Sequence, residues 1–189
     1  MAATKAEGKT VIHNAAKEPE IVDLQNFLNQ LGAKVRGAGT DAIKIRGVEE
    51  LHPVTYQVIP DRIETGTYLL AGAITGGNVI AKDLIPKHVE SILAKLTEAG
   101  IKVEMDGDEV RVIGVENWQG INVKTLPYPG FPTDMQPQFM SLLTLAEGSS
   151  VITETIFDNR LKHADELRRM GADIRLEGNS AIVRGVNQL

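Results

Sequence analysis

A unit of about 70 residues recurs three times in this chain, and this repetition limits the possible folds more than any other sequence feature. Each copy contains, in the same order, a glycine, a short apolar strand, an amphipathic helix that ends on a second glycine, and a hairpin. The leading glycines are Gly8, Gly76 and Gly148, which lie 68 and 72 residues apart. The repeat predicts an α+β chain built from three small α/β units.

Apolar residues recur every three to four positions within these units, which predicts amphipathic helices. The expected helices cover residues 21–31, 62–75, 88–99, 134–147 and 161–170. Each hairpin turn contains glycine together with Asp or Asn, which favour tight turns, and each hairpin leads into a Gly-Val pair. These pairs begin at Gly47, Gly114 and Gly185. Further strands are expected at 56–59 and 121–124.

Residues 126–136 are expected to form a stiff approach to a helix. Three prolines in this stretch fix φ near about −65° and favour an extended chain before each of them. Thr133 has a side chain suited to the N-cap, which would place Asp134 in the first turn. There, unpaired backbone N–H groups favour a carboxylate. Two interpretations remain open, because Asp134 could stabilise the helix start or could contact a substrate.

Two arginines are expected at helix starts, where the helix dipole disfavours a cation. Superposing the repeats places Arg62 at the position that Asp134 occupies in the next unit. Arg160 falls early in the last expected helix, after a cap at Asp158 or Asn159. We therefore expect each arginine to have an anionic partner, either a neighbouring side chain or a ligand that carries phosphate.

Composition narrows the possible functions. The net charge is −5, and the two signs are interspersed without a basic block, so no nucleic-acid partner is expected. No apolar run approaches the ~20 residues that span a membrane, and no signal sequence is evident. The chain has no cysteine, and its four histidines are scattered, so we expect neither a metal site nor a cysteine nucleophile. We expect a cytoplasmic protein without a cofactor.

Several long phrases closely resemble the UDP-N-acetylglucosamine 1-carboxyvinyltransferases, a family of enolpyruvyl transferases. They are Pro-Tyr-Pro-Gly-Phe-Pro-Thr-Asp-Met-Gln at 127–136, Ile-Pro-Asp-Arg-Ile-Glu-Thr-Gly-Thr at 59–67, Asp-Glu-Leu-Arg-Arg-Met-Gly-Ala at 165–172, and residues 14–23. The resemblance covers essentially all 189 residues. It implies an inside-out α/β barrel (α-β prism) of six repeats in two lobes, of which this chain holds about three. Residues 1–58 would end one lobe, and residues 59–189 would form part of the second.

The resemblance also implies a reaction. The family transfers the enolpyruvyl group of phosphoenolpyruvate to the 3-hydroxyl of UDP-N-acetylglucosamine, at the start of peptidoglycan synthesis, and so serves cell wall biogenesis, cell shape and cell division. Asp134 matches the aspartate that binds the acceptor hydroxyl and is the favoured general base. Ile156 falls where the family uses backbone contacts to the sugar nucleotide, and Arg160 matches an arginine near the phosphate of phosphoenolpyruvate. Arg62 is a further candidate for substrate binding.

Other parts of the family's site have no counterpart here. The reactive cysteine, a lysine and an asparagine upstream of it, and a C-terminal aspartate and arginines belong to segments outside this chain. We therefore expect the chain to be inactive alone and to need the remainder of the enzyme as a partner. The alternative is a truncated, non-catalytic paralogue that binds sugar nucleotide or a partner protein. A relative that acts on shikimate phosphate is disfavoured by the phrase at 127–136.

Overall fold

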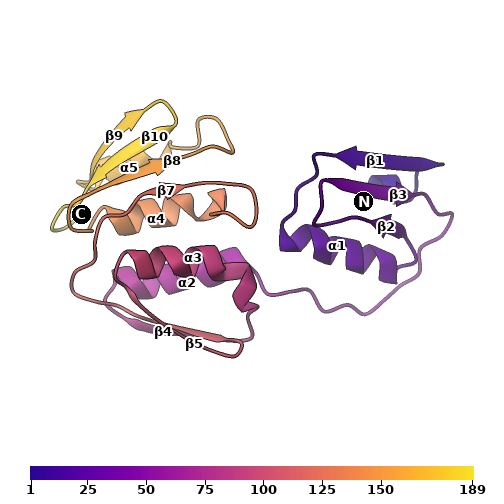
Figure 1. The fold of residues 1–189 in the computed structure, drawn as a ribbon, viewed down its shortest axis with the longest axis horizontal. Coiled ribbons are helices and arrows are strands. Elements are labelled where there is room, and N and C mark those ends of the chain that lie inside the picture. Colours follow the sequence, from indigo (N-terminus) through magenta and orange to yellow (C-terminus); the bar gives the residue numbers. More distant parts are fainter. The chain divides into compact units, whose positions relative to one another are not determined.

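The three copies of the repeat form three small sheets (Figure 1). The three sheets share the same internal strand order. The computed structural model describes residues 1–189 and divides into two compact units, Met1–Ile59 and Pro60–Leu189. The first unit begins with a short 3₁₀ turn, Ala2–Thr4. Its sheet has the order β1-β3-β2, and its elements are β1 (Lys9–His13), α1 (Pro19–Gln30), β2 (Lys34–Arg36) and β3 (Ala42–Arg46).

The second unit contains the other two sheets. The sheet ordered β4-β6-β5 is formed with α2 (Arg62–Ile74), β4 (Asn78–Ala81), α3 (Pro86–Glu98), β5 (Lys102–Asp106) and β6 (Glu109–Ile113). The sheet ordered β7-β8-β10-β9 is formed with β7 (Val123–Lys124), the 3₁₀ turn η2 (Thr133–Met135), α4 (Gln136–Leu143), β8 (Ser149–Thr153), α5 (His163–Arg169), β9 (Asp173–Glu177) and β10 (Ser180–Arg184). In each sheet the last strand of the repeat is central and antiparallel to both neighbours from that repeat, and β7 adds a parallel strand to β8.

The expected class of α/β repeats is confirmed, with three corrections to element boundaries. The helix expected at 134–147 begins as a 3₁₀ turn, and its regular part is only Gln136–Leu143, with a proline in its first turn. The helix expected at 161–170 begins at His163, because Asn159 has a φ of 57° and the chain turns there. Residues 56–59 form no strand, and the Tyr56 hydroxyl instead donates to Asp23 Oδ1 of α1 at 2.6 Å.

The glycine that leaves each hairpin explains why the Gly-Val pair recurs. A Cβ on Gly185 would lie 1.6 Å from the carbonyl oxygen of Ala146, and the Gly185 N–H donates to Gly148 O at 3.0 Å. Gly47 makes the same approach in the first repeat, again with 1.6 Å between an added Cβ and a backbone oxygen, and a Cβ on Gly114 would lie 2.5 Å from the Cα of Gly76. Only glycine fits where two backbones touch. The contact therefore fixes the end of each hairpin against the start of its own repeat.

The two units have separate buried cores. In the second unit several side chains of α4 are fully buried, and Phe139 of this helix packs edge-on against Phe131 with ring centroids 4.9 Å apart. Leu28, Val35 and Ile45 belong to the core of the first unit, which is much smaller. None of the helices is both long enough and apolar enough to cross a membrane.

The solvent-facing side of the first sheet carries only basic charge. Arg46 of the central strand lies opposite Lys9 on one neighbour and Lys34 on the other, and Lys44 lies opposite Arg36. All five side chains are exposed, and none of them forms an ion pair. We call this set of five residues the basic face. Like charges directly opposite each other destabilise a sheet, so this arrangement costs stability.

The close contact at Gly185 generates a testable prediction. Gly185→Ala would push a methyl group into the Ala146 backbone, which cannot move aside as a flexible side chain could. We expect a loss of about 3 kcal/mol in the free energy of unfolding, measured by urea titration. Gly178→Asn is the matched control, because Gly178 has open space around it and a φ of 60°, which Asn tolerates. Equal stability of the two variants would contradict this explanation of the repeated glycine.

Candidate functional site

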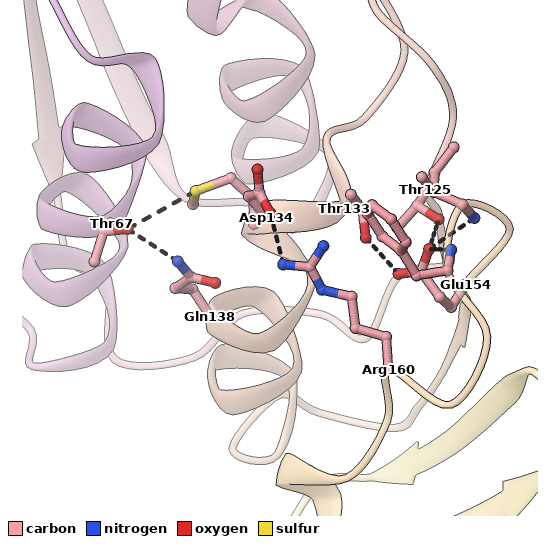
Figure 2. A network of polar contacts seen from close by, with 10 residues as sticks. Thr67, Thr125, Thr133, Asp134, Gln138, Glu154 and Arg160 are labelled. Carbon is pink, nitrogen blue, oxygen red and sulfur yellow. Dashed lines mark hydrogen bonds and ion pairs between the residues drawn. The ribbon is translucent and has the colours of Figure 1, made fainter.

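Asp134 lies in the 3₁₀ turn that precedes α4, at the end of the proline-rich approach (Figure 2). Its neighbour Met135 is fully buried, so the turn is anchored while the Asp134 side chain remains 51% exposed. The expected N-cap role of Thr133 is wrong. Pro132 occupies the N-cap, and the Thr133 hydroxyl donates instead to Glu154 Oε2 at 2.8 Å, because that buried carboxylate is the stronger acceptor.

Asp134 and Arg160, two of the residues singled out in the sequence, form an ion pair. Arg160 Nη2 donates to Asp134 Oδ1 at 2.6 Å, and Figure 2 shows the two side chains pointing toward each other. The guanidinium also lies over the Phe157 ring, 5.1 Å from its centroid. Arg160 is not in a helix, because α5 begins only at His163. The anionic partner that was expected for Arg160 is therefore a neighbouring carboxylate, Asp134, in this structure. Partly exposed pairs of this kind contribute only ~0.2–1 kcal/mol, so the pair can be exchanged for other partners.

Arg62 lies at the start of α2, as the sequence predicts, behind a cap formed by Asp61. The Asp61 carboxylate accepts hydrogen bonds from the backbone N–H groups of Ile63 and Glu64 at 2.7 and 3.1 Å. Arg62 itself is buried, and its guanidinium lies 5.7 Å from the centroid of the Tyr128 ring. Tyr128 belongs to the approach that leads to Asp134. Arg62 therefore packs beside that approach, and its contact with a substrate remains a prediction.

Glu154 is the residue of this region that the sequence reasoning missed. It follows strand β8, is 2% exposed, and its carboxylate accepts four hydrogen bonds. The donors are Thr125 Oγ1 at 2.8 Å, Thr133 Oγ1 at 2.8 Å, and the backbone N–H groups of Ile156 at 2.8 Å and Phe157 at 3.3 Å. The available signal was an acidic residue between two threonines at a strand end, directly before the segment that carries Arg160.

Ile156, the fourth residue expected to contact substrate, lies in the loop after β8. Its N–H is already bound by Glu154, so a backbone contact to a ligand would have to use its carbonyl oxygen. A hollow of about 170 Å³ lies beside this loop and is lined in part by Phe157, Arg160 and Lys162. Two larger hollows, of about 550 and 630 Å³, include neither Asp134 nor Arg160. No group of three or more acidic or histidine side chains is placed to hold a metal ion.

Two titratable groups near Arg160 have shifted pKa values. Burial alone would raise the pKa of Glu154, but the hydrogen bonds from Ile156, Thr133, Thr125 and Phe157 outweigh it, and the net pKa lies below its ordinary value. The pKa of His163 is also lowered, chiefly by burial and further by the positive charge of Arg160. Glu154 is therefore ionised and His163 neutral at pH 7.

These shifts predict how stability depends on pH. Both groups bind protons less readily in the folded chain, so both contributions are lost as pH falls. The His163 contribution is complete above 6.5, the ordinary pKa, and declines below it; the Glu154 contribution is complete above 4.5 and declines below that. We expect the urea midpoint to fall in these two ranges. His163→Gln should flatten only the first decline and Glu154→Gln only the second, and unchanged profiles in both variants would contradict the assignment.

The chain is similar to known proteins over its whole length. The model of the family described as EPSP synthase (3-phosphoshikimate 1-carboxyvinyltransferase) matches residues 1–189. Three similar relatives are each named UDP-N-acetylglucosamine 1-carboxyvinyltransferase 1, and all matches extend over the whole chain. The relatives from Carboxydothermus hydrogenoformans, Caldanaerobacter subterraneus subsp. tengcongensis and Symbiobacterium thermophilum are 59%, 57% and 59% identical, over 45%, 46% and 43% of their own length. The chain thus spans less than half the length of these relatives.

Solved structures agree with this result. The enolpyruvyl transferase NikO from Streptomyces tendae matches 97% of this chain with a TM-score of 0.81 and 26% identity, over 44% of its own length. The EPSP synthase from Acinetobacter baumannii matches 99% of this chain and 44% of its own with a TM-score of 0.53, and at 18% identity it supports the fold alone. Together with the α/β repeats and the full-length family match, these findings show that the chain belongs to the EPSP synthase family of enolpyruvyl transferases.

Proposed function

We propose that this chain is part of an enzyme that transfers the enolpyruvyl group of phosphoenolpyruvate to the 3-hydroxyl of UDP-N-acetylglucosamine, in peptidoglycan precursor synthesis. The observation that carries the proposal is the identity of 57–59% over all 189 residues to relatives with that name. The ion pair between Asp134 and Arg160 supports it, because it brings together a candidate proton acceptor and a candidate phosphate ligand.

Asp134 has the role of general base in this proposal. As the acceptor oxygen forms its bond to C2 of phosphoenolpyruvate, the carboxylate takes the hydroxyl proton, and C3 receives a proton from an acid outside this chain. The C3 proton is then lost, the C2–O bond to phosphate breaks, and the double bond re-forms. The products are the enolpyruvyl ether and inorganic phosphate. Asp134 suits the first step because its side chain is half exposed on an anchored turn.

Arg160 has the role of phosphate ligand. A guanidinium binds phosphate oxygens with charge-assisted hydrogen bonds, and Arg160 offers it on a loop beside a hollow that Lys162 also lines. In this structure Arg160 Nη2 donates to Asp134 Oδ1, an oxygen of the carboxylate that would accept the hydroxyl proton. Binding of a phosphate to Arg160 would compete with this contact and free the carboxylate. Donor binding and release of the base would therefore be coupled.

The chain alone holds only a fraction of such a site. The hollow beside Arg160 is about 170 Å³, whereas pockets for drug-sized ligands are commonly ~300–1,000 Å³. The acid that protonates C3 also lies elsewhere in this proposal. Catalytic groups that act as a unit lose many powers of ten in rate when several are absent. We propose that the remainder of the enzyme supplies the missing groups.

The first prediction of this proposal concerns the 189-residue chain itself. Incubated with phosphoenolpyruvate and UDP-N-acetylglucosamine, it should release no phosphate above a trace, while the Carboxydothermus hydrogenoformans relative assayed in parallel serves as the positive control. Phosphate release at an enzymatic rate would refute the requirement for further segments. Calorimetric titration with UDP-N-acetylglucosamine tests the alternative of a non-catalytic paralogue. Tight binding to this chain would favour that alternative if turnover is absent both in the chain alone and in a complete enzyme that contains it.

The second prediction concerns Asp134 in a complete enzyme that contains this segment. Asp134→Asn keeps the shape of the side chain but removes the base, so kcat should fall about 10²–10⁴-fold. The control is Glu166→Gln, because Glu166 also lies in a first helical turn, also pairs with an arginine, Arg169 at 3.1 Å, and does not line the hollow beside Arg160. That control should keep kcat near normal. If Asp134→Asn also turns over normally and only melts at a slightly lower temperature, Asp134 is a structural residue.

A further inference from the structure

Glu154 connects the two segments that carry Asp134 and Arg160. We propose that Glu154 is a positioning residue, which holds the Asp134 carboxylate and the Arg160 guanidinium in the geometry that the transfer reaction needs. This inference rests on the proposed function, because it assigns Glu154 a role in the same site. Glu154 itself is buried and is not expected to touch substrate.

The first link runs to the segment of Asp134. Thr133 directly precedes Asp134, and its hydroxyl donates to Glu154 Oε2 at 2.8 Å. Glu154 Oε1 accepts from the hydroxyl of Thr125, which stands at the start of the proline-rich approach. Thr125 and Phe131 also pair across this approach. Glu154 therefore holds both ends of the loop whose last turn presents Asp134 (Figure 2).

The second link runs to the segment of Arg160. Glu154 Oε1 accepts from the backbone N–H groups of Ile156 at 2.8 Å and Phe157 at 3.3 Å. The Phe157 ring in turn supports the Arg160 guanidinium, 5.1 Å from the ring centroid. One carboxylate thus fixes the residue before Asp134 and the residue on which Arg160 rests.

Glu154 is in turn held by the turn between β9 and β10. Its N–H donates to Asn179 O at 2.8 Å, and Asn179 Nδ2 donates to Glu154 O at 2.9 Å. Its carboxylate can serve as a fixed reference point because the backbone that carries it is bonded on both sides. The four donors also compensate the cost of burying its charge.

A positioning role and a merely structural role make different predictions. If Glu154 only stabilises the fold, its removal should lower stability and leave the order of Arg160 intact. If it positions the site, Arg160 should lose its defined place over Phe157. That place has a spectroscopic signature, because protons above an aromatic ring are shifted upfield in the NMR spectrum. Ser150 offers a matched control, because it lies on β8, the strand that Glu154 follows, and its buried hydroxyl accepts a hydrogen bond from the Ile121 N–H at 3.1 Å.

The test compares NMR spectra and amide hydrogen exchange of the 189-residue chain with those of Glu154→Ala, Glu154→Gln, Thr133→Val and Ser150→Ala. In Glu154→Ala we expect the upfield shift of the Arg160 side-chain protons to be lost. Exchange of the Ile156 and Phe157 amides should accelerate about 10- to 100-fold, as for loss of hydrogen bonds to a charged acceptor. Glu154→Gln should retain the shift, because its amide oxygen can keep the bonds to the backbone and the Thr133 hydroxyl can turn to accept from its NH₂ group.

The remaining variants decide the interpretation. Thr133→Val removes only the hydrogen bond between Glu154 and the segment of Asp134. It should therefore disturb Arg160 without accelerating amide exchange at Ile156. This variant provides the test if Glu154→Ala fails to fold. Ser150→Ala should lose stability and keep the Arg160 shift. Retention of the Arg160 shift in both Glu154→Ala and Thr133→Val, or in Thr133→Val alone where Glu154→Ala does not fold, would overturn the proposal.

Failure of the proposed function is distinguishable from failure of this inference. If Arg160 loses its order in these variants but Asp134→Asn is fully active in the complete enzyme, Glu154 positions the two side chains and the assigned reaction is wrong. If Asp134→Asn is slow and Arg160 keeps its order, the reaction stands and Glu154 is only structural.

Discussion

The backbone contact between the exit glycine and the start of each repeat is the constraint on which the rest of the chain depends. In the third repeat Gly185 touches Ala146, just beyond the end of α4, so the central strand β10 and the helix cannot slide past each other. Strand β8 pairs with β10, and the loop with Glu154 and Arg160 leaves β8. The point at which that loop leaves the sheet thus follows from a contact in which no side chain takes part, and the Glu154 network then holds the loop against the turn that carries Asp134.

Two electrostatic interactions at the site differ in strength, and the difference determines what each can do. Hydrogen bonds to a charged group contribute ~1.5–3 kcal/mol each, and the buried Glu154 carboxylate accepts four of them. The partly exposed pair of Asp134 and Arg160 is worth ~0.2–1 kcal/mol. The geometry is therefore set by the buried network, while the exposed pair remains free to exchange partners. A rigid buried network next to an exposed, exchangeable ion pair suits a site that must admit charged ligands.

The sequence predicts most of the architecture and only part of the site. The repeat, the helices and the hairpins follow from local apolar periodicity and turn residues, which act over short distances. The resemblance assigned Asp134 and Arg160 separate substrate contacts, but their ion pair was not predicted, because 26 residues and a whole strand separate them. The role of Thr133 was mispredicted since a cap preference is weaker than a bond to a buried carboxylate. Glu154 was missed because its donors come from three separate segments.

The basic face was invisible in the sequence for a related reason, since its five cations are spread over three strands and meet only when the sheet forms. Residues 1–59 contain seven Lys or Arg and seven Asp or Glu, so the net charge of −5 lies in residues 60–189. The first unit is thus neutral but electrically polarised. Added salt screens the repulsion within its sheet while also weakening the exposed ion pairs of the second unit. Ionic strength therefore affects the stability of the first unit through the basic face, even though that unit has no net charge.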